Sequence, residues 1–187
     1  IILPEGDGNE VYDNARRSFQ QAVKDMIQDE PSLYLYRESG EDFSQRGLIL
    51  AVSLSDYADG WIKKHEETRE KPLRDRVRHI EATGANTGLV WTIFRSKPNI
   101  KQLMDDTEKG DPVADFSKFG YRHTLWRLSD TNIIEAIQSA FKHVALYIAD
   151  GHHRIRAAYE YSRQHDKTEA QYVMVFVASD DEMRILP

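Results

Sequence analysis

Four short apolar segments, separated by helical patterns, restrict the fold of this chain more than any other feature. They are GLILAVSL (47–54), GLVWTIF (88–94), ALYIA (145–149) and YVMVFVA (172–178). Such short, continuously apolar runs are typical of strands buried on both faces. Helical spacing, capping residues or an initial proline predict helices at 9–28, 72–83, 98–107, 131–142 and 151–165. We therefore expect an α/β or α+β fold, a mixed β-sheet with flanking helices.

Four further segments are predicted to be strands of hairpins. SLYLYRE (32–38) precedes a Gly-Glu-Asp turn and is expected to pair with the strand at 47–54. PVADFSKF and YRHTLWRLS are separated by Gly120, which predicts a second hairpin, and MRIL (183–186) begins a partner for 172–178. A chain of 187 residues is expected to be one domain, with sub-lobes at 1–110 and 111–187 as the alternative.

Composition excludes several classes of function. The absence of cysteine rules out disulfides, zinc–thiolate sites and thiol catalysis, and it fits a cytoplasmic protein. No apolar run approaches the ~20 residues that cross a bilayer, so no membrane partner is expected. The formal charge of −6 and the lack of a basic helix-turn-helix argue against direct nucleic-acid binding. The chain starts without methionine and stops within a strand-like run, so we expect a piece of a longer protein.

The segment YIADGHHR places five polar or flexible residues between a buried strand and a helix. The first turn of a helix leaves N–H groups unpaired and carries about half a positive charge, so it attracts anions. Gly151 removes a Cβ where a ligand would approach, while His152, His153 and Arg154 add donors. Asp150 is suited to cap the helix, to orient a histidine or to face a magnesium ion.

The sequence of this junction is open to two other interpretations. In the first, Asp150 and Gly151 only cap a helix, and the two histidines are solvated or pair with a neighbour. In the second, the histidines bind a transition metal. Neighbouring residues on a helix project about 100° apart, whereas a helical zinc pair is spaced i, i+4, and no HExxH motif occurs. We therefore expect no His-ligated metal.

A second polar segment, KKHEETREKP, has the residue types that a small-molecule kinase needs. Such an enzyme requires a base for the acceptor hydroxyl, cations for the transferring phosphate and a carboxylate near magnesium. Glu66 or His65 is suited to be the base, and Lys64 or Arg69 to be the cation. Asp75 or Glu66 is suited to contact the metal. The alternative is a solvated surface loop, as charge runs usually are.

Three motifs in order resemble a widespread bacterial family, domain of unknown function one thousand and fifteen. They are IADGHHR followed by two alanines, GWIKKHEETREKPLRDRVRH (60–79) and HTLWRLSD (123–130). The resemblance covers nearly the whole chain and implies a central segment of a protein about twice as long. In the second motif it singles out His65, Glu66, Thr68, Lys71, Asp75 and Arg76.

In the third motif, His123 and Trp126 are three residues apart on an expected strand and so face opposite sides. One is expected to be in the core. The other is a candidate for lining a pocket, where the tryptophan could stack on a base.

The Asp-Gly-His-His-Arg sequence is also similar, more distantly, to the phosphate-binding motif of the ParB and sulfiredoxin superfamily, which includes free serine kinases. This resemblance implies that residues 151–154 bind nucleotide phosphates, with ATP or ADP and Mg²⁺ as the cofactor. The implied function is a nucleotide-dependent phosphotransferase acting on a small polar metabolite such as free serine. The alternative is a non-catalytic nucleotide-binding switch or interaction module.

Overall fold

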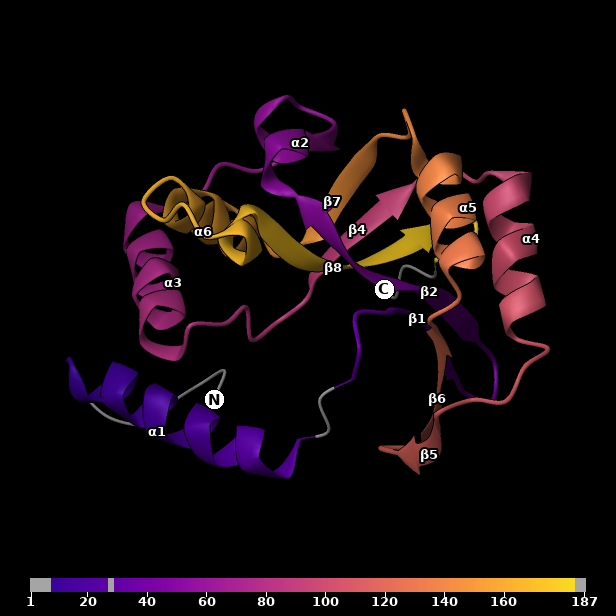
Figure 1. Cartoon of the computed structure of the whole chain (residues 1–187), viewed down its shortest axis with the longest axis horizontal. Coiled ribbons are helices and arrows are strands. Elements are labelled where there is room, and N and C mark those ends of the chain that lie inside the picture. The colour runs from indigo at the N-terminus through magenta and orange to yellow at the C-terminus, as the bar shows by residue number, and fades with distance from the viewer. Residues whose placement is uncertain (1–7, 27–28, 184–187) are drawn as a thin grey trace.

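The computed structural model describes residues 8–26 and 29–183 (Figure 1). These residues form six α-helices and a short 3₁₀-helix: α1 (Glu10–Asp25), α2 (Leu54–Ala58), α3 (Glu70–Thr83), α4 (Pro98–Thr107), α5 (Thr131–Phe141), α6 (His152–Ser162) and η1 (Thr168–Gln171). Among the helices described, none combines the length and the apolar character that crossing a membrane requires.

Eight strands form one mixed sheet: β1 (Leu33–Ser39), β2 (Ser44–Ser53), β3 (Ile62–Lys63), β4 (Val90–Phe94), β5 (Ala114–Lys118), β6 (Tyr121–Leu128), β7 (Leu146–Asp150) and β8 (Tyr172–Ser179). Their order is β3-β7-β4-β8-β2-β1-β6-β5. The β3–β7 and β4–β8 pairs are parallel, and the other pairs are antiparallel. The predicted class, a mixed α/β sheet with helices, is confirmed.

Both internal hairpins predicted from the sequence are present. β1 pairs with β2, and β5 pairs with β6 across a turn in which Phe119 and Gly120 have φ values of 54° and 84°. Two positive φ values in succession are typical of the tight turns that join antiparallel strands, and they explain the glycine. The predicted strand at 183–186 lies, but for its first residue, outside the described residues.

A single core joins the helices to one face of the sheet. Along β8, Val173 and Val175 are at most 1% exposed, whereas Met174 between them is 39% exposed. The inward residues of the strands form one cluster with apolar residues of α2 to α6, such as Leu54 and Ile155. In Figure 1, α4 and α5 pack together on one side, and α3 and α6 on the other. Each fully buried aliphatic side chain stabilises the fold by roughly 1.5–3 kcal/mol.

Strands from the two halves of the chain are interleaved in this sheet. β6, from the second half, pairs with β1, and β8 lies between β2 and β4. Residues 1–110 and 111–187 therefore do not form separate sheets within the part of the chain that the structure describes. The core crosses the expected boundary as well, because Val177 and Leu48 belong to one cluster.

Residues 56–72, which contain the KKHEETREKP segment, have more structure than a solvated surface loop would. The Ser53 side chain accepts a hydrogen bond from the Ser55 amide and caps α2, whose Leu54 is 2% exposed. β3 then pairs with β7, so Lys63 lies opposite Tyr147. Since α3 begins two residues before Pro72, only 64–69 remain irregular, and β3 holds this loop beside the end of β7.

The first helix packs on α3. The Tyr12 hydroxyl donates to the Asp75 carboxylate at 2.7 Å, and the Arg78 guanidinium lies 4.2 Å from the Tyr12 ring centre. The C-terminal half of α1 extends beyond this contact, with Val23 48% and Met26 57% exposed. Asp75 is therefore engaged in holding α1, which lies along α3 (Figure 1).

Candidate functional site

The strand–glycine–helix junction at the end of β7 leaves two backbone donors available. Gly151 has φ +97°, a left-handed conformation, and α6 begins at His152. The amides of Arg154 and Ile155 both donate to the Gly151 carbonyl, at 2.9 and 3.1 Å. The amides of His152 and His153 make no hydrogen bond to another described residue. The positive end of α6 therefore presents two free N–H groups.

Arg154 folds back over Gly151 instead of pointing away from the helix. Its guanidinium donates to the Leu89 carbonyl and to the Asp150 carboxylate. A Cβ at Gly151 would lie 2.9 Å from the Arg154 Nε. Of the three roles suggested for Asp150, capping α6 is not observed, because its side chain pairs with Arg154. The missing Cβ of Gly151 makes room for the arginine.

The two consecutive histidines hold the charged loop over the helix. The His65 amide lies 3.5 Å from the His152 Nε2, and the Arg69 amide donates to the His153 Nε2 at 3.1 Å. Because adjacent residues of a helix diverge by about 100°, the two rings reach opposite ends of the loop. The loop is therefore fastened at both ends to the first turn of α6.

His152 is the buried member of this group, with 6% of its surface exposed. Burial lowers the pKa of His152 below the ordinary histidine value, and the nearby His65 lowers it further. The two rings are perpendicular, with centres 4.4 Å apart. One ligand atom each from His65, Glu66 and His152 lie within 4.8 Å of one another.

A cavity of about 460 Å³ opens at this junction. Its wall includes the first turn of α6, the loop carboxylate Glu66, and residues of α3 and of the segment before β4. Arg76 of α3 lines it and has no hydrogen bond or ion pair to another described residue, so its guanidinium is available to a ligand. The cavity therefore combines backbone donors, a cation and a carboxylate.

The structure separates the other predicted cations from this cavity. Lys64 forms an ion pair with Glu67 at 2.7 Å and lines a different cavity, beside Arg156. Arg69 contributes its backbone amide to the contact with His153, and its side chain is exposed. Neither it nor Thr68 lines the 460 Å³ cavity. Of the basic residues in the second motif, Arg76 is the one that lines this wall.

His123 and Trp126 lie elsewhere in the sheet. Trp126 is 4% exposed, donates from Nε1 to the Gly110 carbonyl at 3.0 Å, and is covered by the Arg37 guanidinium. It is a core residue and does not offer its face to a base. His123 lies 2.7 Å from the Tyr36 hydroxyl. Four strands separate their strand, β6, from β7, which at about 4.8 Å per strand is on the order of 24 Å.

Sequence reasoning missed one wall of the cavity. Asn86, Thr87 and Gly88 line it from the segment between α3 and β4, and buried His79 lines it from α3. The signal was present in GANTG (84–88), a run of small and polar turn residues directly before a buried strand.

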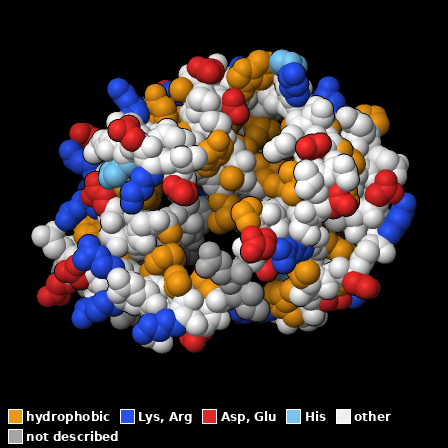
Figure 2. Space-filling model, viewed as in Figure 1, with side chains coloured by type: hydrophobic (Ala, Val, Ile, Leu, Met, Phe, Trp, Pro, Cys, Tyr) orange, Lys and Arg blue, Asp and Glu red, His pale blue; other side chains and the backbone are white. Residues whose placement is uncertain are grey.

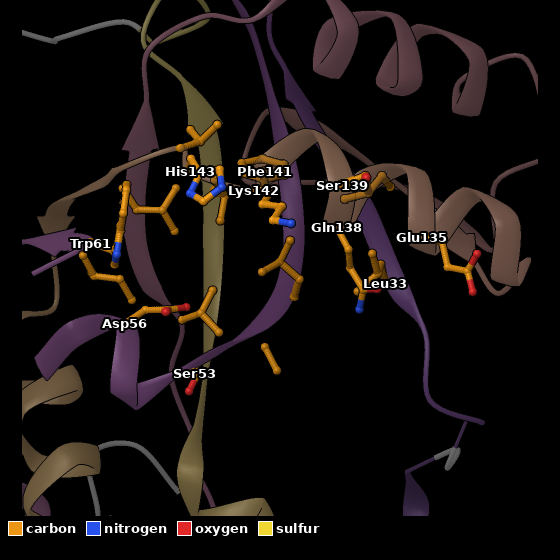
Figure 3. Close-up of a pocket in the computed structure, with 18 residues that line it drawn as sticks. Leu33, Ser53, Asp56, Trp61, Glu135, Gln138, Ser139, Phe141, Lys142 and His143 are labelled. Carbon is orange, nitrogen blue, oxygen red and sulfur yellow. The ribbon is translucent and has the colours of Figure 1, made fainter. Parts of the chain in front are cut away.

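A second, larger cavity of about 770 Å³ lies on the helix-covered face of the sheet (Figure 3). Figure 3 shows Trp61 at one end and Gln138 and Glu135 of α5 towards the other, with His143 and Phe141 between them. In the space-filling view, hydrophobic side chains line a hollow at the centre of the molecule (Figure 2). None of the predicted site residues lines this cavity. Of the residues of β7, Leu146 lines this cavity, and Leu146 is at the end of the strand opposite the junction.

Comparison with known proteins bears on the family alone. No curated protein and no solved structure gives a significant match. A family model described as a protein of unknown function (DUF1015) matches residues 1–187, and this range includes the junction, the charged loop and the segment around His123. Because the match spans the whole sequence given, the chain belongs to the DUF1015 family.

Proposed function

We propose that this protein is a nucleotide-dependent phosphotransferase that acts on a small polar metabolite with a hydroxyl group, such as free serine. One observation carries the proposal: a single cavity is lined by His152, His153, Arg76 and Glu66. Among the described residues, the two histidine amides and the Arg76 guanidinium have no partner, and Glu66 adds a carboxylate. These are the group types that phosphoryl transfer requires, since catalysis there depends on positioning and on charge stabilisation.

The phosphate end of the proposed site is the first turn of α6. Two free N–H groups and the helix dipole favour an anion at this position. Arg76, on the facing wall, can bind phosphate oxygens through two parallel hydrogen bonds. Arg154 is already neutralised by Asp150, so we assign it to shaping the junction. A volume of about 460 Å³ falls in the range of small-ligand sites, roughly 300–1,000 Å³.

The acceptor end is assigned to Glu66. In the transfer, the bond between the terminal phosphorus and the nucleotide oxygen breaks, and a new bond forms to the acceptor oxygen. The hydroxyl proton passes to the Glu66 carboxylate or, where Glu66 holds a divalent metal ion, to His65, the other base of the same loop. The nucleotide, ATP or ADP with Mg²⁺, is suggested by the resemblance of DGHHR to the ParB and sulfiredoxin motif.

The experiment incubates the protein with ATP or ADP, Mg²⁺ and serine, and seeks phosphoserine by mass spectrometry. Arg76→Ala should weaken nucleotide binding by roughly 10- to 100-fold, the value of a charge-assisted hydrogen bond. Arg74→Ala is the matched control, because Arg74 lies on the same helix, is exposed and pairs with Glu70. Glu66→Gln should retain nucleotide affinity and lose transfer.

The results separate the alternatives. Binding that depends on Arg76 without any phosphorylated product would favour the nucleotide-responsive switch. If nucleotides fail to bind, or if Arg74→Ala weakens binding as much as Arg76→Ala, the anion site is wrong. A ligand at a hundred times its Kd should stabilise the fold by about 2.7 kcal/mol, so thermal unfolding provides an independent check.

A further inference from the structure

We propose that His65, Glu66 and His152 form a binding site for a divalent transition-metal ion. The proposal goes beyond the phosphotransferase and does not depend on it. Two of the three ligands come from the 64–69 loop and the third from the first turn of α6, so the site exists only in the folded chain.

The spacing of the three side chains is close to that of a metal site. Bonds of about 2.0–2.2 Å from zinc to nitrogen or oxygen imply that neighbouring ligand atoms lie roughly 3–3.5 Å apart. One donor atom from each side chain already lies within 4.8 Å of the other two. His65 and Glu66 are exposed on an irregular loop, so closing the difference needs side-chain rotation and no change of the sheet.

His152 provides the fixed ligand. It is 6% exposed and is set by the backbone of α6. Its Nε2 faces the loop, since the His65 amide lies 3.5 Å from that nitrogen. A contact of this length is at the limit of a hydrogen bond, so a metal ion that replaced it would cost the fold little.

The donor set indicates the class of ion. Two imidazoles and one carboxylate suit Zn²⁺, Fe²⁺ or Co²⁺, whereas Mg²⁺ and Ca²⁺ prefer oxygen ligands. Three protein ligands leave coordination positions open, as catalytic metal sites do. Both Glu66 and His152 line the 460 Å³ cavity, so the open positions would face the proposed phosphate site.

This inference reverses the expectation from the sequence. That expectation considered the adjacent pair His152 and His153, which diverge on the helix and cannot share an ion. The structure pairs His152 with a histidine 87 positions earlier in the chain, next to a carboxylate. The contact of His153 with the Arg69 amide is also a histidine-to-loop contact, but His153 is not part of the three-residue cluster.

The experiment titrates the full chain, stripped of metal by a chelator and free of nucleotide, with Co²⁺ followed by visible absorption and with Zn²⁺ followed by calorimetry. One ion per chain is expected. His65→Ala and Glu66→Gln change exposed side chains and should each weaken binding by at least ~10-fold. Glu67→Gln, an exposed carboxylate one position further along the same loop and outside the cluster, is the matched control and should leave affinity unchanged. His152→Ala is not part of the test, because truncating this buried side chain would leave a cavity and destabilise the fold.

Three results would overturn the proposal. Several weak sites per chain, unaffected by His65→Ala and Glu66→Gln, would mean adventitious surface binding only. Equal loss on Glu67→Gln would place the ion elsewhere, and tighter binding of Mg²⁺, titrated in the same way, than of Zn²⁺ would exclude a transition-metal site. Because nucleotide and acceptor are absent from this titration, its failure would leave the phosphotransferase proposal standing.

Discussion

Gly151 shows how one residue can be required for two separate reasons. Its φ of +97° lies in the left-handed region, which costs a residue with a Cβ roughly 1–2 kcal/mol. In addition, the Arg154 guanidinium occupies the space above its Cα and is held there by Asp150 and Leu89. The sequence suggested a glycine that clears space for a ligand. The structure shows that an arginine of the same chain occupies that space.

Gly151→Ala should therefore destabilise the protein more than Gly60→Ala does. Gly60 has φ +77°, and nothing lies within 4 Å of the Cβ that would be added there, so this variant isolates the backbone cost of about 1–2 kcal/mol. At Gly151 the alanine must also displace the Arg154 guanidinium. Urea unfolding of both variants measures the difference. Equal losses would show that Arg154 moves aside freely.

At the scale of elements, the turn after β8 is joined to the start of α4 by one carboxylate. Asp181 accepts hydrogen bonds from Ser179 at 2.5 Å and from Ser96 and Lys101 at 3.0 Å each. These contacts, first that with Ser179 and then that with Lys101, lower the pKa of Asp181 to about 2. The carboxylate therefore ties together segments that are some 80 residues apart in the chain.

Asp181→Asn should lower stability at neutral pH and remove part of its acid dependence. A depressed carboxylate pKa stabilises the fold fully above the unfolded-state value, and this contribution is lost as pH falls towards the folded-state value. The difference between wild type and variant should therefore shrink between about pH 4 and pH 2. Denaturant unfolding across that range measures it, with exposed Glu41→Gln as control. A difference that stays constant with pH would contradict the assignment.

At the scale of the whole molecule, a cluster around Arg46 joins β2, α4 and the segment after β8. Its guanidinium bonds to Glu182 at 2.9 Å and to Asp105 at 2.7 Å, and it lies 3.2 Å from Glu108. The arginine side chain is 13% exposed, and those of Glu182 and Glu108 are 14% and 19% exposed. Arg46 is the cation that contacts all three carboxylates, while Arg37 lies 3.3 Å from Glu108 and Lys101 lies 3.7 Å from Glu182.

Arg46→Met should cost about 3 kcal/mol, the lower end of the range for breaking a buried ion pair, because Arg37 and Lys101 remain beside two of the carboxylates. Arg95→Met is the control. Arg95 pairs with Asp180 at 3.4 Å, but its side chain is 83% exposed, and such surface pairs contribute about 0–1 kcal/mol. Chemical denaturation compares the two variants. Similar small losses would mean that the Arg46 cluster is solvated in the native protein.

Local patterns in the sequence determined the type and approximate bounds of most elements, because periodicity and turn residues act within a few positions. They placed β7, Gly151 and α6 in order, predicted at 131–142 the helix that the structure shows as α5, and identified the family. They did not determine that β8 lies between β2 and β4, because buried apolar strands resemble one another and do not encode their neighbours. Likewise, the sequence did not show that Arg76 lines the site and Lys64 does not, or that His65 meets His152. Both depend on packing between distant segments, which only the tertiary structure decides.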